Sequence, residues 1–363
     1  MNAVLYPVCA CIAWISLAFK LAGRGRGPAA VAVALFYLFM GLTFTISDPR
    51  VWGLLGEVSG VPNLALLLSQ GSVMGVAASQ LAALTYWELP AEVARPKVRN
   101  QVYAFSAVFV AMAALFVLAD LETEDTTTAV IRYAGNWRYA LYLLLYVTAF
   151  AIAQCFLVAR CLRYARAVEG RWLGRGLRLA AVGAVGGLAY VLARYADIAA
   201  APLGLDPAAW EPVARLGAGL GAILALVGWS LPGWGPQVSA LRDWVRDVRA
   251  YRALHPLWAA LCRANPDLAL DPGAGRTALR DVDFRLHRRV VEIRDGRRWL
   301  RAPAAPPDLT ADERAAAEAA AIAAALRGGD RLAPPPHAEP HTPSDDETRW
   351  LARVSRAYAA LER

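Results

Sequence analysis

Seven long apolar runs constrain this chain more than any other feature of its sequence. All of them lie between Met1 and about Leu231, and each is near the 20 residues that a helix needs to cross the hydrocarbon core of a bilayer. Because lipid offers no hydrogen-bond partners to the backbone, the runs predict an all-α fold, a polytopic membrane bundle of about seven transmembrane helices. The expected spans are Ala3–Leu21, Pro28–Ile46, Val61–Trp87, Gln101–Ala119, Trp137–Ala159, Leu179–Ala200 and Pro212–Leu231.

The first run is interpreted as a span and not as a signal peptide. It has no basic segment before it, and no A-x-A cleavage pattern follows it before the charged loop. The short apolar segment Val51–Val58 is expected to be a partial helix on the outer surface.

Charges in the loops predict the orientation of the spans, because Lys and Arg are enriched on the cytoplasmic side. The odd-numbered connections are basic, with Lys20, Arg24 and Arg26, then Arg95, Lys97 and Arg99, then Arg160, Arg163, Arg166, Arg171, Arg175 and Arg178. The even-numbered connections are acidic or mixed. We therefore expect a multi-pass protein of the cell membrane, with its N-terminus outside and its C-terminus in the cytoplasm. A net charge of +8 distributed in this way indicates membrane topology and not nucleic-acid binding.

The composition changes near residue 236. Residues 1–235 are expected to form the membrane domain, and residues 236–363 a cytoplasmic helical domain with a flexible segment at about 328–348. A break at Pro232–Pro236 is expected to separate the seventh span from an amphipathic helix at Val238–Asn265. Further helices are expected at Ala278–Gly296, Thr310–Leu326 and Asp346–Leu361, where apolar residues recur at helical spacing. Thr310 with Glu313 has capping-box spacing, and Ser344 is a candidate cap.

Charged residues near the outer ends of the last two spans form the first candidate site. Tyr190, Arg194 and Asp197 share one helix face at i, i+4 and i+7, while Glu211 and Arg215 are spaced i, i+4. Asp197 is expected to pair with Arg194 or to face Arg215 across the helical hairpin. Charged groups in a bilayer are functional-site candidates by default. Two interpretations remain open here, namely a site for an anion or polar ligand and an ion-pair cluster that holds two helices in register, and the second is favoured.

Polar residues on the third span form the second candidate site. Ser69, Ser72, Ser79 and Gln80 are expected within about a third of the helix circumference, flanked by Asn63 and Gln70. Such a face lines a cavity or makes hydrogen bonds between helices, which average only about 0.6 kcal/mol each. Helix contacts are expected at small residues, including Gly217 and Gly221 of the last span.

The third candidate is a surface on the cytoplasmic helix Ala278–Gly296. Its charged residues surround an apolar stripe and suit either a solvated helix face or docking of a protein partner. They are Asp281, Asp283, Arg285, Arg288, Arg289 and Glu292.

No signature of catalysis or of metal binding is found. The chain has no Walker motif, nucleophile elbow or HExxH, and His337 and His341 flank Pro340, which argues against a metal-binding helix. None of the five cysteines has metal-ligand spacing. We expect no catalytic residue, no metal and no cofactor.

Two segments carry a resemblance to a known family. They are YRALHPLW at Tyr251–Trp258 and DVDFRLHRRVVEIRDG at Asp281–Gly296, supported by Trp350–Tyr358 and by Gly60–Ala65. The chain resembles actinobacterial seven-helix membrane proteins, labelled as transporters, that end in a domain of unknown function. His287 departs from the aromatic residue usual in that family. The dominance of arginine over lysine, with only Lys20 and Lys97, is typical of the high-GC genomes of actinobacteria.

Three functions follow as expectations. The resemblance favours a transporter of an unknown small molecule. The alternative is a membrane sensor or signalling module that recruits a cytoplasmic protein partner through residues 236–363. The third is an intramembrane enzyme acting on a lipid-like substrate, with Asp197 and Tyr190 as acid–base groups.

Overall fold

The computed structural model describes two compact units, Met1–Pro236 and Gln237–Arg363. The residues that it describes are 2–23, 25, 27–121, 133, 136–168, 171–200, 209–269, 281–300, 309–328 and 344–362. Within these ranges every regular element is a helix and no strand occurs, which confirms the all-α fold. The loop residues Arg24 and Arg26 lie outside the described ranges.

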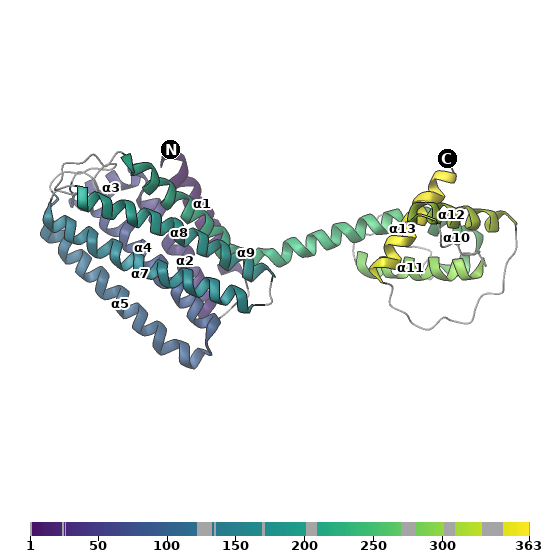
Figure 1. The fold of residues 1–363 in the computed structure, drawn as a ribbon, viewed down its shortest axis with the longest axis horizontal. Helices are drawn as coiled ribbons and strands as arrows, with labels where there is room; N and C mark the ends of the chain where they lie inside the picture. Colours follow the sequence, from purple (N-terminus) through teal and green to yellow (C-terminus); the bar gives the residue numbers. More distant parts are fainter. Residues whose placement is uncertain are drawn as a thin grey trace. The chain divides into compact units, whose positions relative to one another are not determined.

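The membrane unit is a bundle of long apolar helices (Figure 1). Its elements are α1 (Asn2–Ala22), α2 (Pro28–Ile46), α3 (Pro49–Ser59), α4 (Leu64–Glu88), α5 (Ala91–Ala119), α7 (Trp137–Ala167), α8 (Arg171–Ala200) and the start of α9 (Glu211–Ala253). Six helices of the described chain, namely α2, α4, α5, α7, α8 and α9, are long and apolar enough to cross a membrane, and α1 has a shorter apolar part at Tyr6–Ala22. The chain is therefore a multi-pass membrane protein.

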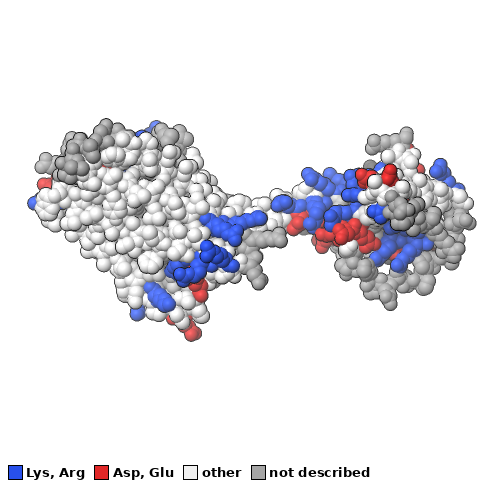
Figure 2. Space-filling view, in the orientation of Figure 1, with Lys and Arg blue, Asp and Glu red and all other residues white. Residues whose placement is uncertain are grey.

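Helix α4 occupies the centre of this bundle. Its apolar window is 67% buried, whereas that of α5 is only 17% buried, and α4 packs against α2, α5 and α7. The difference follows from composition, because the serines, glycines and glutamines of α4 need protein neighbours while the aliphatic surface of α5 is compatible with lipid. On the face seen in Figure 2 this unit is nearly free of charge along its length, and the Lys and Arg side chains visible there gather mostly toward one end.

Helix boundaries differ from expectation at several places. The predicted break at Pro232–Pro236 is wrong, since α9 runs through both prolines as one helix. A proline removes one backbone hydrogen bond and does not necessarily end a helix, and membrane helices often tolerate it. Helix α5 starts at Ala91, ten residues before the expected Gln101, because its first turns are amphipathic and extend past the apolar run. The expected short helix is confirmed as α3, which Asp48 caps by accepting a hydrogen bond from the Arg50 amide at 3.0 Å.

The second unit has its own helical core. It contains α10 (His255–Ala264), the 3-10 turn η3 (Pro266–Leu268), α11 (Val282–Trp299), α12 (Ala311–Gly328) and α13 (Asp345–Leu361). The apolar stripes of these helices meet in a cluster that includes Leu257, Val290, Ile293, Ile322, Leu351 and Val354. Both predicted caps are confirmed, since the Thr310 amide donates to Glu313 at 2.9 Å and the Glu347 amide donates to Ser344 at 3.1 Å. Residues 329–343 of the segment predicted to be flexible lie outside the described chain.

Candidate functional site

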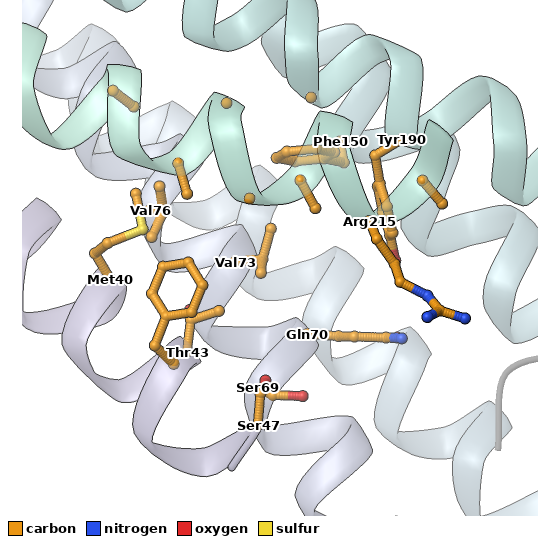
Figure 3. A pocket seen from close by; sticks show the side chains of 18 of the residues that line it. Met40, Thr43, Ser47, Ser69, Gln70, Val73, Val76, Phe150, Tyr190 and Arg215 are labelled. Carbon is orange, nitrogen blue, oxygen red and sulfur yellow. The ribbon is translucent and has the colours of Figure 1, made fainter. Parts of the chain in front are cut away.

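A cavity of about 360 Å³ lies inside the membrane unit (Figure 3). Helices α1, α2, α3, α4, α7, α8 and α9 all contribute side chains to its lining. Its volume falls in the range of small-molecule sites. Figure 3 shows Met40, Val73 and Val76 toward one end of the cavity and Gln70, Tyr190 and Arg215 toward the other. The cavity therefore has an apolar end and a polar end.

A charged network from α8 and α9 forms the polar end. Arg194 is 4% exposed and pairs with Asp197 at 2.8 Å and also with Glu211. Glu211 in turn accepts from Arg215 at 3.1 Å, and the Arg194 guanidinium lies 5.4 Å from the ring centre of Tyr190. Glu211 therefore pairs with both Arg194 and Arg215. With Asp197, the network contains two positive and two negative charges.

The expected contact between Asp197 and Arg215 is absent among the described residues. Asp197 is fully buried and accepts from the indole N–H of Trp210 at 2.7 Å, in addition to pairing with Arg194. Arg194 is closer than Arg215 because it lies one turn away on the same helix. Tyr190, Arg194, Glu211 and Arg215 line the cavity, whereas Asp197 lies behind Arg194 and orients it.

The polar residues of α4 do not share one cavity face. Ser69, Gln70 and Gln80 line the cavity, whereas Ser72 and Ser79 line a separate apolar groove between α2, α4 and α5. The hydroxyls of Ser69, Ser72 and Ser79 donate to carbonyls of their own helix at 2.7–3.1 Å, so they need no partner across the bundle. Asn63 is fully buried at the start of α4, outside the cavity lining.

Four buried polar atoms of residues that line the cavity lack partners within the described chain. They are the indole Nε1 of Trp52, the side-chain oxygens of Gln70 and Gln80 and the Nε of Arg194. Buried polar groups are almost always hydrogen-bonded, and leaving one unsatisfied costs about 1–3 kcal/mol. Exceptions that cluster in one cavity indicate a place where a ligand or water completes the bonding.

Tyrosines of α7 and α1 also contribute to the polar end, and the sequence reasoning missed them. Tyr146 lines the cavity and hydrogen-bonds to Tyr190, and Tyr6 of α1 also lines it. Tyr139, Tyr142 and Tyr146 are spaced i, i+3 and i+7, which is the signal that identifies them as one buried face of α7. Such a face was available in the sequence, but aromatic residues in membrane helices are usually interpreted as packing.

Glycines bring α8 and α9 into backbone contact along the cavity. A Cβ on Gly221 would lie 2.8 Å from the Gly183 carbonyl oxygen, and one on Gly183 would lie 2.7 Å from the Gly221 carbonyl oxygen. Gly186 and Gly217 meet in the same reciprocal way at 2.9 and 2.7 Å. The predicted small-residue contact is confirmed, and its partner is α8. Gly183 and Gly221 also line the cavity, so the contact shapes its wall.

A layer of large side chains closes the apolar end of the cavity. Each member lies one helical turn beyond a lining residue, and all four are buried; they are Phe36, Leu84, Cys161 and Trp229, next to Met40, Gln80, Leu157 and Ala225. The rings of Phe36 and Trp229 are 5.5 Å apart, and Trp87 stacks on Trp229 at 5.3 Å. We call these four residues the floor layer. At the other end Arg215, whose side chain is 52% exposed, marks the mouth.

The charged residues of α11 do not form one exposed surface, which corrects the third candidate site. Asp281 and Asp283 are exposed, and Arg285 and Arg288 are half-buried, but Arg289 and Glu292 are buried. Arg289 lies 3.6 Å from the ring centre of Tyr251 and 4.5 Å from that of Trp258. A guanidinium between two aromatic faces gains cation–π attraction, so Arg289 belongs to the core of the second unit.

The described residues offer little for catalysis or metal binding. They contain no cluster of His, Cys, Asp and Glu able to hold a metal ion. Burial raises the pKa of the Cys262 thiol to about 11, so this sulfur stays protonated near neutral pH. Asp197, the expected acid–base group, is enclosed by Arg194 and Trp210 and does not line the cavity.

Comparison with known proteins gives one match. Residues 243–360 match a family described as a family of unknown function (DUF6545). No curated protein and no solved structure matches the chain. The match supports the expected C-terminal domain of unknown function, while neither a transporter assignment nor an actinobacterial source follows from it.

Proposed function

We propose that this protein is a transporter of the cell membrane that binds its solute in the cavity of the helical bundle. The observation that carries the proposal is a cavity lined by unsatisfied buried polar groups, open at the charged network and closed at its other end by the floor layer. Transporters bind substrate near the bilayer midplane and open to one side at a time. A cavity open at Arg215 and closed at Trp229 fits such a one-sided state.

The positions of the basic residues indicate which side of the membrane the open end of the cavity faces. The basic residues Arg160, Arg163 and Arg166 lie toward the C-terminal end of α7, and Arg175 and Arg178 lie toward the N-terminal end of α8. The rule that Lys and Arg face the cytoplasm then puts the mouth outside and the floor layer on the cytoplasmic side.

Cysteine accessibility tests the proposal without knowledge of the solute. In a background with the five native cysteines replaced by alanine, Val73→Cys puts a thiol in the cavity lining. We expect a membrane-impermeant maleimide to label it from the outside, and also from the cytoplasmic side in inverted vesicles, because a transporter exposes its site to both sides in turn. Adding Trp229→Ala should increase the cytoplasmic labelling by thinning the floor layer.

The matched control is Ala83→Cys on the same helix. Ala83 is fully buried and lines neither the cavity nor the groove, so it should resist the reagent from both sides. Labelling of Val73→Cys from the outside alone, even with Trp229→Ala present, would contradict transport and favour a receptor.

A sensor is the second candidate, favoured by one feature of α11. Phe284 is 62% exposed beside the exposed Asp283 and the half-buried Arg288, and an aromatic residue flanked by charges is typical of protein interfaces. If this surface recruits a partner, Phe284→Asp should remove a stoichiometric protein from the purified full chain. Arg298→Asp, at another exposed position of α11, is the control and should retain it. An unchanged set of co-purified proteins would contradict the sensor hypothesis.

A further inference from the structure

The polar end of the cavity is electrically balanced, and this limits the head group that it accepts. Arg194 and Arg215 are matched by Asp197 and Glu211 in one connected network of ion pairs. No other charged residue lines the cavity within the described chain. At the depth of Arg194 a charged head group would have to compete for a partner that is already engaged, and would leave one buried charge of the network unpaired.

The polar end has hydrogen-bonding atoms without partners in the described chain, although its charges are paired. The Gln70 side chain is 6% exposed, its oxygen accepts nothing from the described chain, and the Nε of Arg194 has no acceptor there. Gln70 and Arg194 both line the polar end. A hydroxyl or an amide carries both a donor, which the Gln70 oxygen lacks, and an acceptor, which the Arg194 Nε lacks.

The rest of the cavity suits a hydrocarbon chain. From Gln70 the lining continues along α4 through Val73 and Val76, over roughly 15 Å to the level of Gln80 at 1.5 Å per residue. Most facing side chains from other helices are also apolar, including Met40, Phe44, Phe150 and Leu157, and the polar exceptions include Thr43 and Gln154. Burial of apolar surface here favours a chain that lies along α4.

We propose that the ligand of this cavity is an uncharged amphiphile, with a hydroxyl- or amide-bearing head group at Gln70 and Arg194 and a hydrocarbon chain along Val73 and Val76. This inference rests on the proposed function and adds the chemical class of the solute. Lipid-like alcohols and neutral acylated molecules belong to the class, whereas fatty acids and alkylamines do not.

Photolabelling of the purified full chain in phosphatidylcholine nanodiscs tests the class. Three probes share one saturated chain with a diazirine and differ only in a terminal hydroxyl, carboxylate or ammonium group. We expect the hydroxyl probe to label cavity peptides from α4 and α7 at least about tenfold more than either charged probe, a ratio that corresponds to about 1.4 kcal/mol. Mass spectrometry of the digested protein locates the labels.

A matched pair of variants separates recognition of the head group from general partition into the bundle. Gln70→Leu should abolish the preference for the hydroxyl probe, whereas Gln80→Leu makes the same chemical change at the apolar end and should retain it. Each variant removes a buried amide oxygen that has no partner in the described chain, and the melting temperature of each is measured to confirm that it folds.

The outcomes separate this inference from the proposed function. Cavity labelling by a charged probe that equals or exceeds labelling by the hydroxyl probe would overturn the head-group class while leaving the cavity as a binding site. A hydroxyl preference that survives Gln70→Leu would also overturn it. Labels confined to lipid-facing peptides would overturn the amphiphile altogether, and two-sided labelling of Val73→Cys would then still support transport.

Discussion

The glycine contact between α8 and α9 should be the most sensitive packing feature of the membrane unit. Gly221→Ala puts a methyl carbon 2.8 Å from the Gly183 carbonyl oxygen and 3.2 Å from the Gly187 nitrogen. Carbon–oxygen contacts between packed helices usually lie at about 3.3–3.6 Å, so the two backbones must separate by at least about half an ångström. Overpacking of this kind costs about 1–3 kcal/mol.

Alanine also brings a gain in helix propensity, and the control must carry the same gain. Gly233→Ala lies in the same helix, where an added Cβ meets no atom within 4 Å. The propensity gain of about 1 kcal/mol applies to both variants, so the difference between them isolates the collision. For a unit of this size 1 kcal/mol corresponds to about 2–4 °C, and we expect Gly221→Ala to melt about 2–12 °C below Gly233→Ala.

Thermal unfolding of the purified full chain in detergent, followed by tryptophan fluorescence, measures this difference. The double variant Gly183→Ala with Gly221→Ala should lose less stability than the sum of its parts, because the first methyl already separates the helices. Equal melting temperatures of Gly221→Ala and Gly233→Ala would refute the reasoning, since the backbones would then not be in contact.

Two further predictions concern the second unit. Arg289→Ala should destabilise it by about 2–4 kcal/mol in chemical unfolding, because the side chain donates to the Tyr251 carbonyl at 2.7 Å and stacks on two rings. The control Arg298→Ala, at an exposed position, should change the free energy of unfolding by less than about 0.5 kcal/mol. Equal effects of the two variants would contradict the placement of Arg289 in the core. Hydrogen bonds from the Thr310 side chain and backbone lower the pKa of Glu313 below its ordinary value. The contribution of this cap is therefore present above the pKa of unfolded glutamate and is lost as the pH falls through the lowered value. Hydrogen exchange of the first-turn amides of α12 should accelerate over that acidic range, and Glu313→Gln should remove the pH dependence.

Much of the architecture was determined by the sequence itself. In a bilayer every backbone hydrogen bond must be made within the chain, so long apolar runs have one stable outcome, and the helices appear where the runs predict them. Caps are equally local, which is why Thr310, Glu313 and Ser344 were recognised from spacing alone. The local sequence did not predict that α9 continues through Pro232 and Pro236. Each proline removes one backbone hydrogen bond, and the remaining hydrogen bonds of this long helix keep it continuous.

The candidate site was decided mainly by tertiary structure. The sequence identifies Arg194, Asp197 and Glu211 as costly in a membrane, but only the approach of α8 to α9 determines that Arg194 joins both acids. The rotation of α4 about its axis divides its polar residues between the cavity and the apolar groove. The spacing of residues shows which of them share a helix face but not which neighbouring helices that face will contact. Arg289 is hidden among aromatic rings for the same reason, because a charge pattern does not show which neighbours a folded helix will meet.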